Sequence, residues 1–89
     1  MAIYRVIMVN RSSPTPPWQQ LAELLRARIE SGELQPGDRI PSVVGLAQEY
    51  ELAAGTVRKA LTALQQEGLI VSRVGWGTFV AERGPGAGS

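Results

Sequence analysis

The chain has 89 residues and a formal net charge of +1, so it holds one small domain whose total charge attracts partners only weakly over distance. Apolar residues make up 44% of the chain and charged residues 19%, which excludes a disordered polar chain and a membrane-spanning one. The absence of cysteine and histidine removes disulfides, thiolate chemistry, the usual zinc ligands and the commonest general base. We therefore expect no metal, no cofactor and no enzyme activity. No signal-peptide pattern and no membrane partner are expected, so the sequence predicts a cytoplasmic protein.

The first ten residues, 1–10, are expected to form an N-terminal strand or extension. Ala2 to Val9 are rich in Ile, Val and Tyr, which favours a strand with two apolar faces. Two interpretations stay open. In the first, this segment mediates dimerisation by closing a shared sheet, paired with the chain's own hairpin or with the same segment of the partner chain. In the second, it is an intramolecular third strand that covers a small core.

The first helix is predicted over residues 17–31. Pro16 and Pro17 suit a first helical turn, with Thr15 as the candidate N-cap, and Gly32 provides a left-handed end. Apolar residues follow at helical spacing: Trp18, Leu21, Leu25 and Ile29.

A tight turn and two further helices come next. Gln35-Pro36-Gly37-Asp38 places Pro and Gly at the central positions of a type II turn. Ser42 is the candidate N-cap of a short helix over about residues 43–50. A second helical pattern predicts a helix over 54–67, ended by Gly68.

These two helices have the spacing of a helix-turn-helix, whose second helix enters the major groove of DNA. The residues expected where the two helices pack together are apolar or small: Leu46, Ala47, Tyr50, Leu52, Val57 and Ala60. Between residues 52 and 66 the only charged side chains are Arg58 and Lys59, which indicates one face for DNA. The alternative is an ordinary small α+β domain with no such role.

Two strand-like runs, 69–73 and 78–81, are joined by 74–77, whose two glycines permit a tight reversal. A glycine-rich hairpin tip lets the backbone approach phosphates closely. The predicted fold is α+β: a winged helix-turn-helix of three helices followed by a β-hairpin wing, with an extra N-terminal strand. It assigns 11–82 to the DNA-binding domain and 83–89 to a disordered tail.

Several motifs stand along the chain: Pro36-Gly37-Asp38-Arg39-Ile40-Pro41-Ser42, Leu46-Ala47, Thr56-Val57-Arg58, Ala60-Leu61, Leu64, Glu67-Gly68-Leu69 and Gly75-Trp76-Gly77-Thr78-Phe79-Val80. Together they resemble the GntR family of regulators over about residues 17–82. The resemblance implies a homodimer that binds operator DNA, with the third helix in the major groove and the wing tip at the minor groove. Members generally carry a C-terminal effector domain, and we expect none within these residues.

The sequence departs from the family pattern at four positions. The family usually has an arginine where this chain has Val44, an acidic residue at Gly45, and Ser-Arg at Ala53-Ala54. The resemblance therefore supplies no counterpart for the two main base-reading arginines. The family pattern is matched at Thr56, Arg58, Gly75 and Thr78.

The candidate DNA contacts are Arg39, Ser42, Ala54, Gly55, Thr56, Arg58, Lys59, Arg73, Gly75, Trp76, Gly77 and Thr78. Arg58 is a candidate for a phosphate or a guanine edge, and Lys59 for a phosphate. Thr56, in the first turn of its helix, is a candidate for a phosphate or a thymine methyl group. The alternative for the arginines is an ordinary solvated side chain. Trp76 either packs against the sugar-phosphate edge or a partner chain, or folds back over the hairpin.

Two functions from different classes follow. The first is a sequence-specific transcriptional regulator, a repressor that reads two operator half-sites as a homodimer. The second, motivated by Val44 and Ala54, is a winged-helix module that docks protein partners and has lost operator reading.

Overall fold

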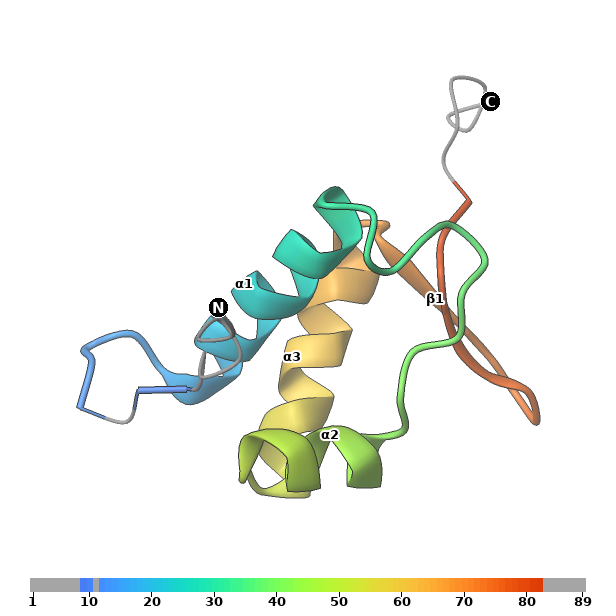
Figure 1. Cartoon of the computed structure of the whole chain (residues 1–89). Helices are drawn as coiled ribbons and strands as arrows, with labels where there is room; N and C mark the ends of the chain where they lie inside the picture. Colours follow the sequence, from blue (N-terminus) through green and yellow to red (C-terminus); the bar gives the residue numbers. More distant parts are fainter. Residues whose placement is uncertain (1–8, 11, 83–89) are drawn as a thin grey trace.

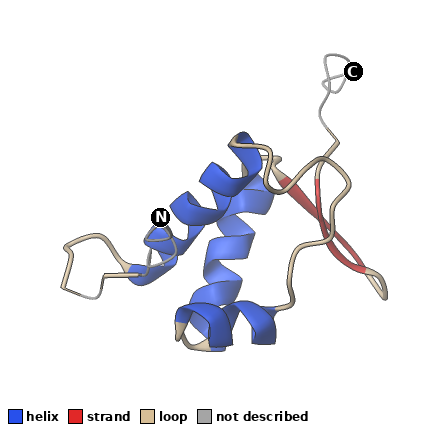
Figure 2. Cartoon of the chain, in the orientation of Figure 1, coloured by secondary structure: helices blue, strands red, loops and turns tan. Residues whose placement is uncertain are grey.

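The computed structural model describes residues 9–10 and 12–82 of the chain. The elements in chain order are α1 (Pro17–Glu30), α2 (Val43–Tyr50), α3 (Ala54–Gln66), β1 (Ile70–Arg73) and β2 (Gly77–Val80) (Figure 1, Figure 2). The predicted three helices and hairpin are confirmed, each bound within about one residue. The predicted strand over Ala2 to Val9 lies outside the described residues apart from Val9, which is not in a strand, and 83–89 lie outside them too.

Helix α1 begins without the predicted side-chain cap. Thr15 was expected at the N-cap, and this prediction is wrong, because Pro16 holds that position and no side chain there bonds to the helix. A residue before a proline is kept in extended conformations, so Thr15 stays outside the helix. The side chain of Gln20 holds the segment that precedes α1. Its amide donates to the Thr15 carbonyl at 2.8 Å, and its carbonyl accepts from the Asn10 amide at 2.7 Å.

The turn between α1 and α2 has the predicted type II form. The Asp38 amide donates to the Gln35 carbonyl at 2.9 Å, and Gly37 has a φ of +88°, which a side chain would make costly. The Asp38 carboxylate accepts from the Gln35 amide at 2.8 Å, so it stabilises the turn.

Residues 37–40 then pair with β2, which the sequence analysis did not predict. Val80 exchanges hydrogen bonds with this segment, accepting from the Gly37 amide at 2.9 Å and donating to the Asp38 carbonyl at 2.8 Å. The Ile40 amide donates to the Thr78 carbonyl at 2.8 Å. Since β2 also pairs antiparallel with β1, it is hydrogen-bonded along both edges. The wing is therefore attached to the segment that leads into α2.

The helix-turn-helix is formed by α2, three connecting residues and α3. Ser42 caps α2 as predicted, its hydroxyl accepting from the Gly45 amide at 3.0 Å, an interaction worth about 1 kcal/mol. Glu51 ends α2 in the left-handed conformation, with φ of +57°, and the Leu52 amide donates to the Ala47 carbonyl at 2.9 Å. In Figure 1, α2 lies across the lower end of α3, where α3 begins.

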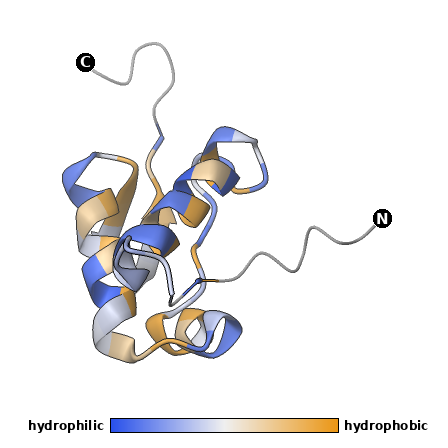
Figure 3. Cartoon of the chain, turned by 90° about the vertical axis from the view of Figure 1, so that its left-hand side faces the viewer, coloured by the Kyte–Doolittle hydropathy of each residue, from blue (hydrophilic) through white to orange (hydrophobic). Residues whose placement is uncertain are grey.

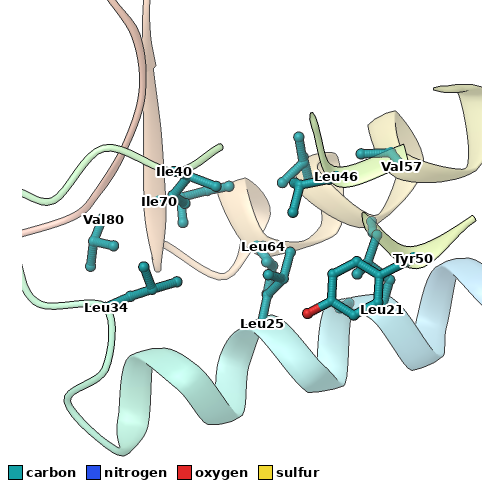
Figure 4. Packing of buried hydrophobic residues seen from close by; sticks show 13 residues of the cluster. Leu21, Leu25, Leu34, Ile40, Leu46, Tyr50, Val57, Leu64, Ile70 and Val80 are labelled. Carbon is teal, nitrogen blue, oxygen red and sulfur yellow. The ribbon is translucent and has the colours of Figure 1, made fainter. Parts of the chain in front are cut away.

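One hydrophobic core joins all five elements. Its buried members are Leu21, Ala22, Leu25, Leu34, Ile40, Leu46, Tyr50, Val57, Ala60, Leu61, Leu64, Ile70 and Val80. Leu21 and Leu25 point from α1 toward Leu64 and Tyr50 (Figure 4). Each helix alternates hydrophobic and hydrophilic residues along its length, as elements with one buried side do (Figure 3). Complete burial of a leucine contributes roughly 1.5–3 kcal/mol, so this core holds the wing and the helix-turn-helix in one unit.

An exposed ion pair connects α1 to the end of α3. Arg26 donates to the Glu67 carboxylate at 2.7 and 3.0 Å, and this hydrogen bond lowers the pKa of Glu67 below its usual value. Glu67 thus has a structural role on the side of the chain away from the start of α3. Within the described part of the chain, no helix has the length and apolar character needed to cross a membrane.

Candidate nucleic-acid interface

The solvent side of α3 carries the predicted recognition residues. Val57, Ala60, Leu61 and Leu64 face the core, whereas Gly55, Arg58 and Lys59 are exposed. Thr62 and Gln66 are exposed too. Thr62 follows Arg58 by four residues and Gln66 follows Thr62 by four, so both extend this face of the helix. These two were not predicted. The helical repeat that placed Arg58 would have found them.

Arg58 is the basic side chain of α3 that stands unengaged. No carboxylate occurs in the sequence of α3, and within residues 9–10 and 12–82 no hydrogen bond or ion pair holds the Arg58 guanidinium. Its five donors are therefore available to a phosphate or to the edge of a guanine.

Lys59 has a partner within the chain that the sequence did not reveal. Its ammonium nitrogen lies 5.0 Å from the ring centroid of Trp18, at the start of α1. Such a cation–π contact at an exposed site is worth roughly 0.5–1 kcal/mol. Lys59 therefore leans toward α1, and a phosphate has to compete with the indole for it.

The first turn of α3 is built from small residues. Ala53 occupies the N-cap and makes no side-chain hydrogen bond. Ala54 and Thr56 are half-buried and Gly55 is exposed, with nothing within 4 Å of a Cβ placed on it. The positive end of the α3 dipole is thus open to close approach by a polyanion.

At the start of α2, the hydroxyl of the predicted contact Ser42 accepts the capping hydrogen bond from the Gly45 amide. Two residues later, Val44 exposes 63% of its surface, although Val43 beside it is half-buried and Leu46 is buried. In the sequence, Val44 is a departure from the family pattern and a reason to consider a protein-docking module. Its exposure follows from the helical repeat, since position 44 lies away from the core positions 43, 46, 47 and 50.

The wing ends in an exposed apolar tip. The Trp76 amide closes the turn by donating to the Arg73 carbonyl at 2.9 Å. Val74 is 99% exposed and Trp76 is 72% exposed, so the hairpin covers little of the indole. Trp76 borders an open groove together with Val71 and Phe79 of the outer sheet face.

Arg39 belongs to the wing as well. It pairs with Phe79 through an isolated bridge, and its guanidinium packs against Gly77. A Cβ added at Gly77 would lie 2.8 Å from the Arg39 Nε, and the residue's φ is +121°. Gly77 therefore makes room for Arg39 on the wing, while Thr78 is half-buried and its carbonyl is held by Ile40.

Most of the candidate contacts, together with the exposed Val44 and Val74, form two groups. We name the first the helix surface, made of Val44, Ala54, Gly55, Thr56 and Arg58, and the second the wing surface, made of Arg39, Arg73, Val74, Gly75 and Trp76. In Figure 1, α2, the start of α3 and the hairpin turn all lie at the lower end of the molecule. The elements that carry most of the two surfaces therefore lie toward the same end of the molecule. No metal-ligand cluster of acidic side chains forms within the ranges that the structure covers.

Comparison with known proteins gives a consistent result. The family model described as "Bacterial regulatory proteins, gntR family" matches residues 17–80. The transcriptional repressor NagR of Bacillus subtilis (strain 168) is 40% identical over 74 residues, covering 83% of this chain and 30% of NagR. The histidine utilization repressor of Klebsiella aerogenes is 40% identical over 72 residues, covering 81% and 30%. The chain spans under a third of the length of these relatives.

Solved structures agree with the sequence matches. The DNA-binding domain of AraR in complex with operator ORX1 aligns with a TM-score of 0.73 at 36% identity, covering 75% of this chain and 81% of that one. YtrA from Sulfolobus acidocaldarius, a GntR-family transcription factor, aligns with a TM-score of 0.75 at 37% identity, covering 85% and 64%. These matched proteins are DNA-binding regulators of transcription and not enzymes.

Proposed function

The chain belongs to the gntR family of bacterial regulatory proteins, whose winged helix domains bind DNA, and we propose that residues 11–82 read an operator. The observation that carries the proposal is the alignment with the AraR DNA-binding domain, a structure that contains operator DNA. In this proposal α3 enters the major groove and the wing reaches the adjacent minor groove. We propose that the regulator is a repressor that acts in the cytoplasm. The names of NagR and the histidine utilization repressor support the repressor role.

The exposed residues support this placement of α3. Arg58 has no partner in the described chain, and Gly55 leaves the start of the helix open to DNA. Thr56 follows in the same turn, where the helix dipole favours a phosphate, although its own amide already donates to the Ala53 carbonyl at 3.0 Å. The wing contributes Arg39 and Arg73, two guanidinium groups suited to backbone phosphates.

Salt dependence gives the proposal a quantitative form. If Arg39, Arg58 and Arg73 of both protomers of a dimer each neutralise one phosphate, log Kobs falls with log salt at a slope of about −5. Two half-sites one helical turn apart would be read by the two protomers.

We further propose that Ala2 to Val9 mediate dimerisation, because the strand that their sequence predicts would have two apolar faces and need cover on both. The expected result is a dimer for the full chain in light scattering and a monomer for a variant lacking residues 1–9. The same oligomer in both samples would contradict this part of the proposal.

The decisive experiment selects bound duplexes from a randomised pool and then measures affinity by fluorescence anisotropy at low and near-physiological salt. Enrichment of a palindromic motif and a steep salt slope are the expected results. Arg58→Ala provides the matched variant, since it removes the unengaged guanidinium and leaves the buried side of α3 intact.

A second function is favoured by the exposed apolar residues Val44, Val74 and Trp76. They fit a module that docks protein partners and no longer reads operators. Absence of duplex binding at both salt concentrations would support this function and reject the first.

A further inference from the structure

We propose that Val44 is a specificity-determining residue that reads the C5-methyl group of thymine in the major groove, an inference that rests on the proposed function. The contact would be shared with the first turn of α3. The protein would then recognise its half-site through methyl groups at positions where longer polar side chains would recognise guanine.

The exposure of Val44 is the first observation. Among the described residues, four large apolar side chains are exposed, and Val71, Val74 and Trp76 all belong to the hairpin. Val44 is the one on a helix of the helix-turn-helix, at 63% exposure. An isopropyl group offers nothing to a phosphate, but it packs well against another methyl group in the absence of water.

The composition of the surrounding surface is the second observation. Helix α2 contains no basic residue, and the first turn of α3 consists of Ala54, Gly55 and Thr56. A guanine is read by two parallel hydrogen bonds from Arg or Lys, and these positions provide neither. Alanine and the threonine methyl group are instead suited to the thymine methyl.

The position of α2 is the third observation. It lies at the end of α3 where α3 begins, on the side toward which the hairpin turn also points (Figure 1). Because Ala53 to Gly55 carry little or no side chain, the two helices can approach the groove closely enough for short apolar groups to reach base edges.

The test replaces thymine by deoxyuridine, which lacks only the C5-methyl group, at each position of the selected half-site. Anisotropy should show a loss of about fourfold in affinity for each methyl group that is read. In the Val44→Ala protein, the ratio of the affinities for the thymine and deoxyuridine duplexes should fall to near one at the position that Val44 contacts. No loss at any position, in a protein that binds the duplex well, would overturn the inference.

Two matched variants separate the methyl contact from general effects. Val71→Ala truncates an exposed valine of the hairpin, and it should preserve the full difference between thymine and deoxyuridine. Arg58→Ala should weaken binding to both duplexes by the same factor. If Val71→Ala abolishes the difference as Val44→Ala does, the assignment to Val44 fails.

A second arm distinguishes the methyl group from the shape of the base pair. At the sensitive position, 5-methylcytosine should bind more tightly than cytosine by the same factor of about four. Equal binding of the two would show that the thymine preference comes from DNA shape and would overturn the inference. If the protein binds no duplex of the starting pool, the proposed function itself is rejected.

Discussion

The helix surface and the wing surface belong to elements at the same end of one small domain, yet their chemistry differs. The helix surface presents Val44 and the small residues of the first turn of α3, with Arg58 as its one basic group. The wing surface presents Arg39 and Arg73 around an apolar tip that includes Trp76. As defined, the wing surface holds two basic groups and the helix surface one, next to the exposed Lys59 of α3. Short side chains are concentrated on the helices.

This difference separates two tasks in DNA binding. Phosphate contacts hold a protein in register on the duplex, whereas base contacts give it sequence preference. In the proposed function, the wing supplies two guanidinium groups for phosphates, and the helix surface discriminates between bases by close apolar contact. The comparison therefore predicts that substitutions on the wing change affinity for all duplexes, while those on the helix surface change sequence preference.

The largest effect is expected for Arg58→Ala, which removes the basic group of the helix surface and leaves both arginines of the wing surface in place. Affinity for the selected operator should fall about tenfold to hundredfold, the usual cost of losing one well-placed guanidinium. Anisotropy titration measures it, with Lys59→Ala as the matched control. Because Lys59 is engaged with Trp18 at 5.0 Å, its removal should cost less, and the reverse order would contradict our assignment.

Gly77→Ala tests the wing in the folded protein itself. The added Cβ meets the Arg39 Nε at 2.8 Å in a backbone with φ of +121°, so the free energy of unfolding should fall by roughly 1–3 kcal/mol. Urea unfolding followed by circular dichroism measures the change. In contrast, Gly55→Ala places its methyl in open space on a helix and should raise stability by about 0.5–1 kcal/mol. Equal effects for the two glycines would count against the contact between Arg39 and the wing.

Trp76→Ala sharpens the role of the apolar tip. If the indole packs on the DNA, affinity should fall about twofold to tenfold for specific and nonspecific duplexes alike. Trp18→Phe leaves Trp76 as the sole indole, and its emission should shift to shorter wavelength when duplex is added. An unchanged emission spectrum in a bound complex would place Trp76 away from DNA.

The smallest effect concerns the ion pair that lies outside both surfaces. The hydrogen bond from Arg26 lowers the pKa of Glu67, so the pair stabilises the fold above the usual carboxyl pKa and this contribution is lost as pH falls through the lowered value. Glu67→Gln should therefore lower the melting temperature slightly at pH 7 and leave it unchanged near pH 2. Operator affinity should stay the same, and any loss would extend the interface to this end of the domain.

Local patterns were enough to predict most of the fold. The helical repeat of Leu21 and Leu25, the Ser42 cap and the Gln35 to Asp38 turn each depend on neighbours in sequence, and all are confirmed. The Thr15 cap was wrong because Pro16 occupies the N-cap position directly before Pro17. Local rules of this kind place an element well and the residue that caps it less well.

Contacts between distant residues were not predictable from the sequence. The pairing of residues 37–40 with β2 involves a short segment without strand alternation, so no pattern marked it. The contact of Lys59 with Trp18 and that of Arg39 with Gly77 each join residues about forty positions apart. Residue type identified these side chains as candidates, and only the packing of α1 and the wing determined which of them stand free.

The hydrogen bonds between residues 37–40 and β2 have one more consequence. They fix the distance between the wing and α2, so the protein would contact DNA at two points with a fixed spacing. A duplex whose groove spacing differs from that span has to bend or change its twist to meet both points. Stiff and flexible base steps would then bind with different free energies even at positions that no side chain touches.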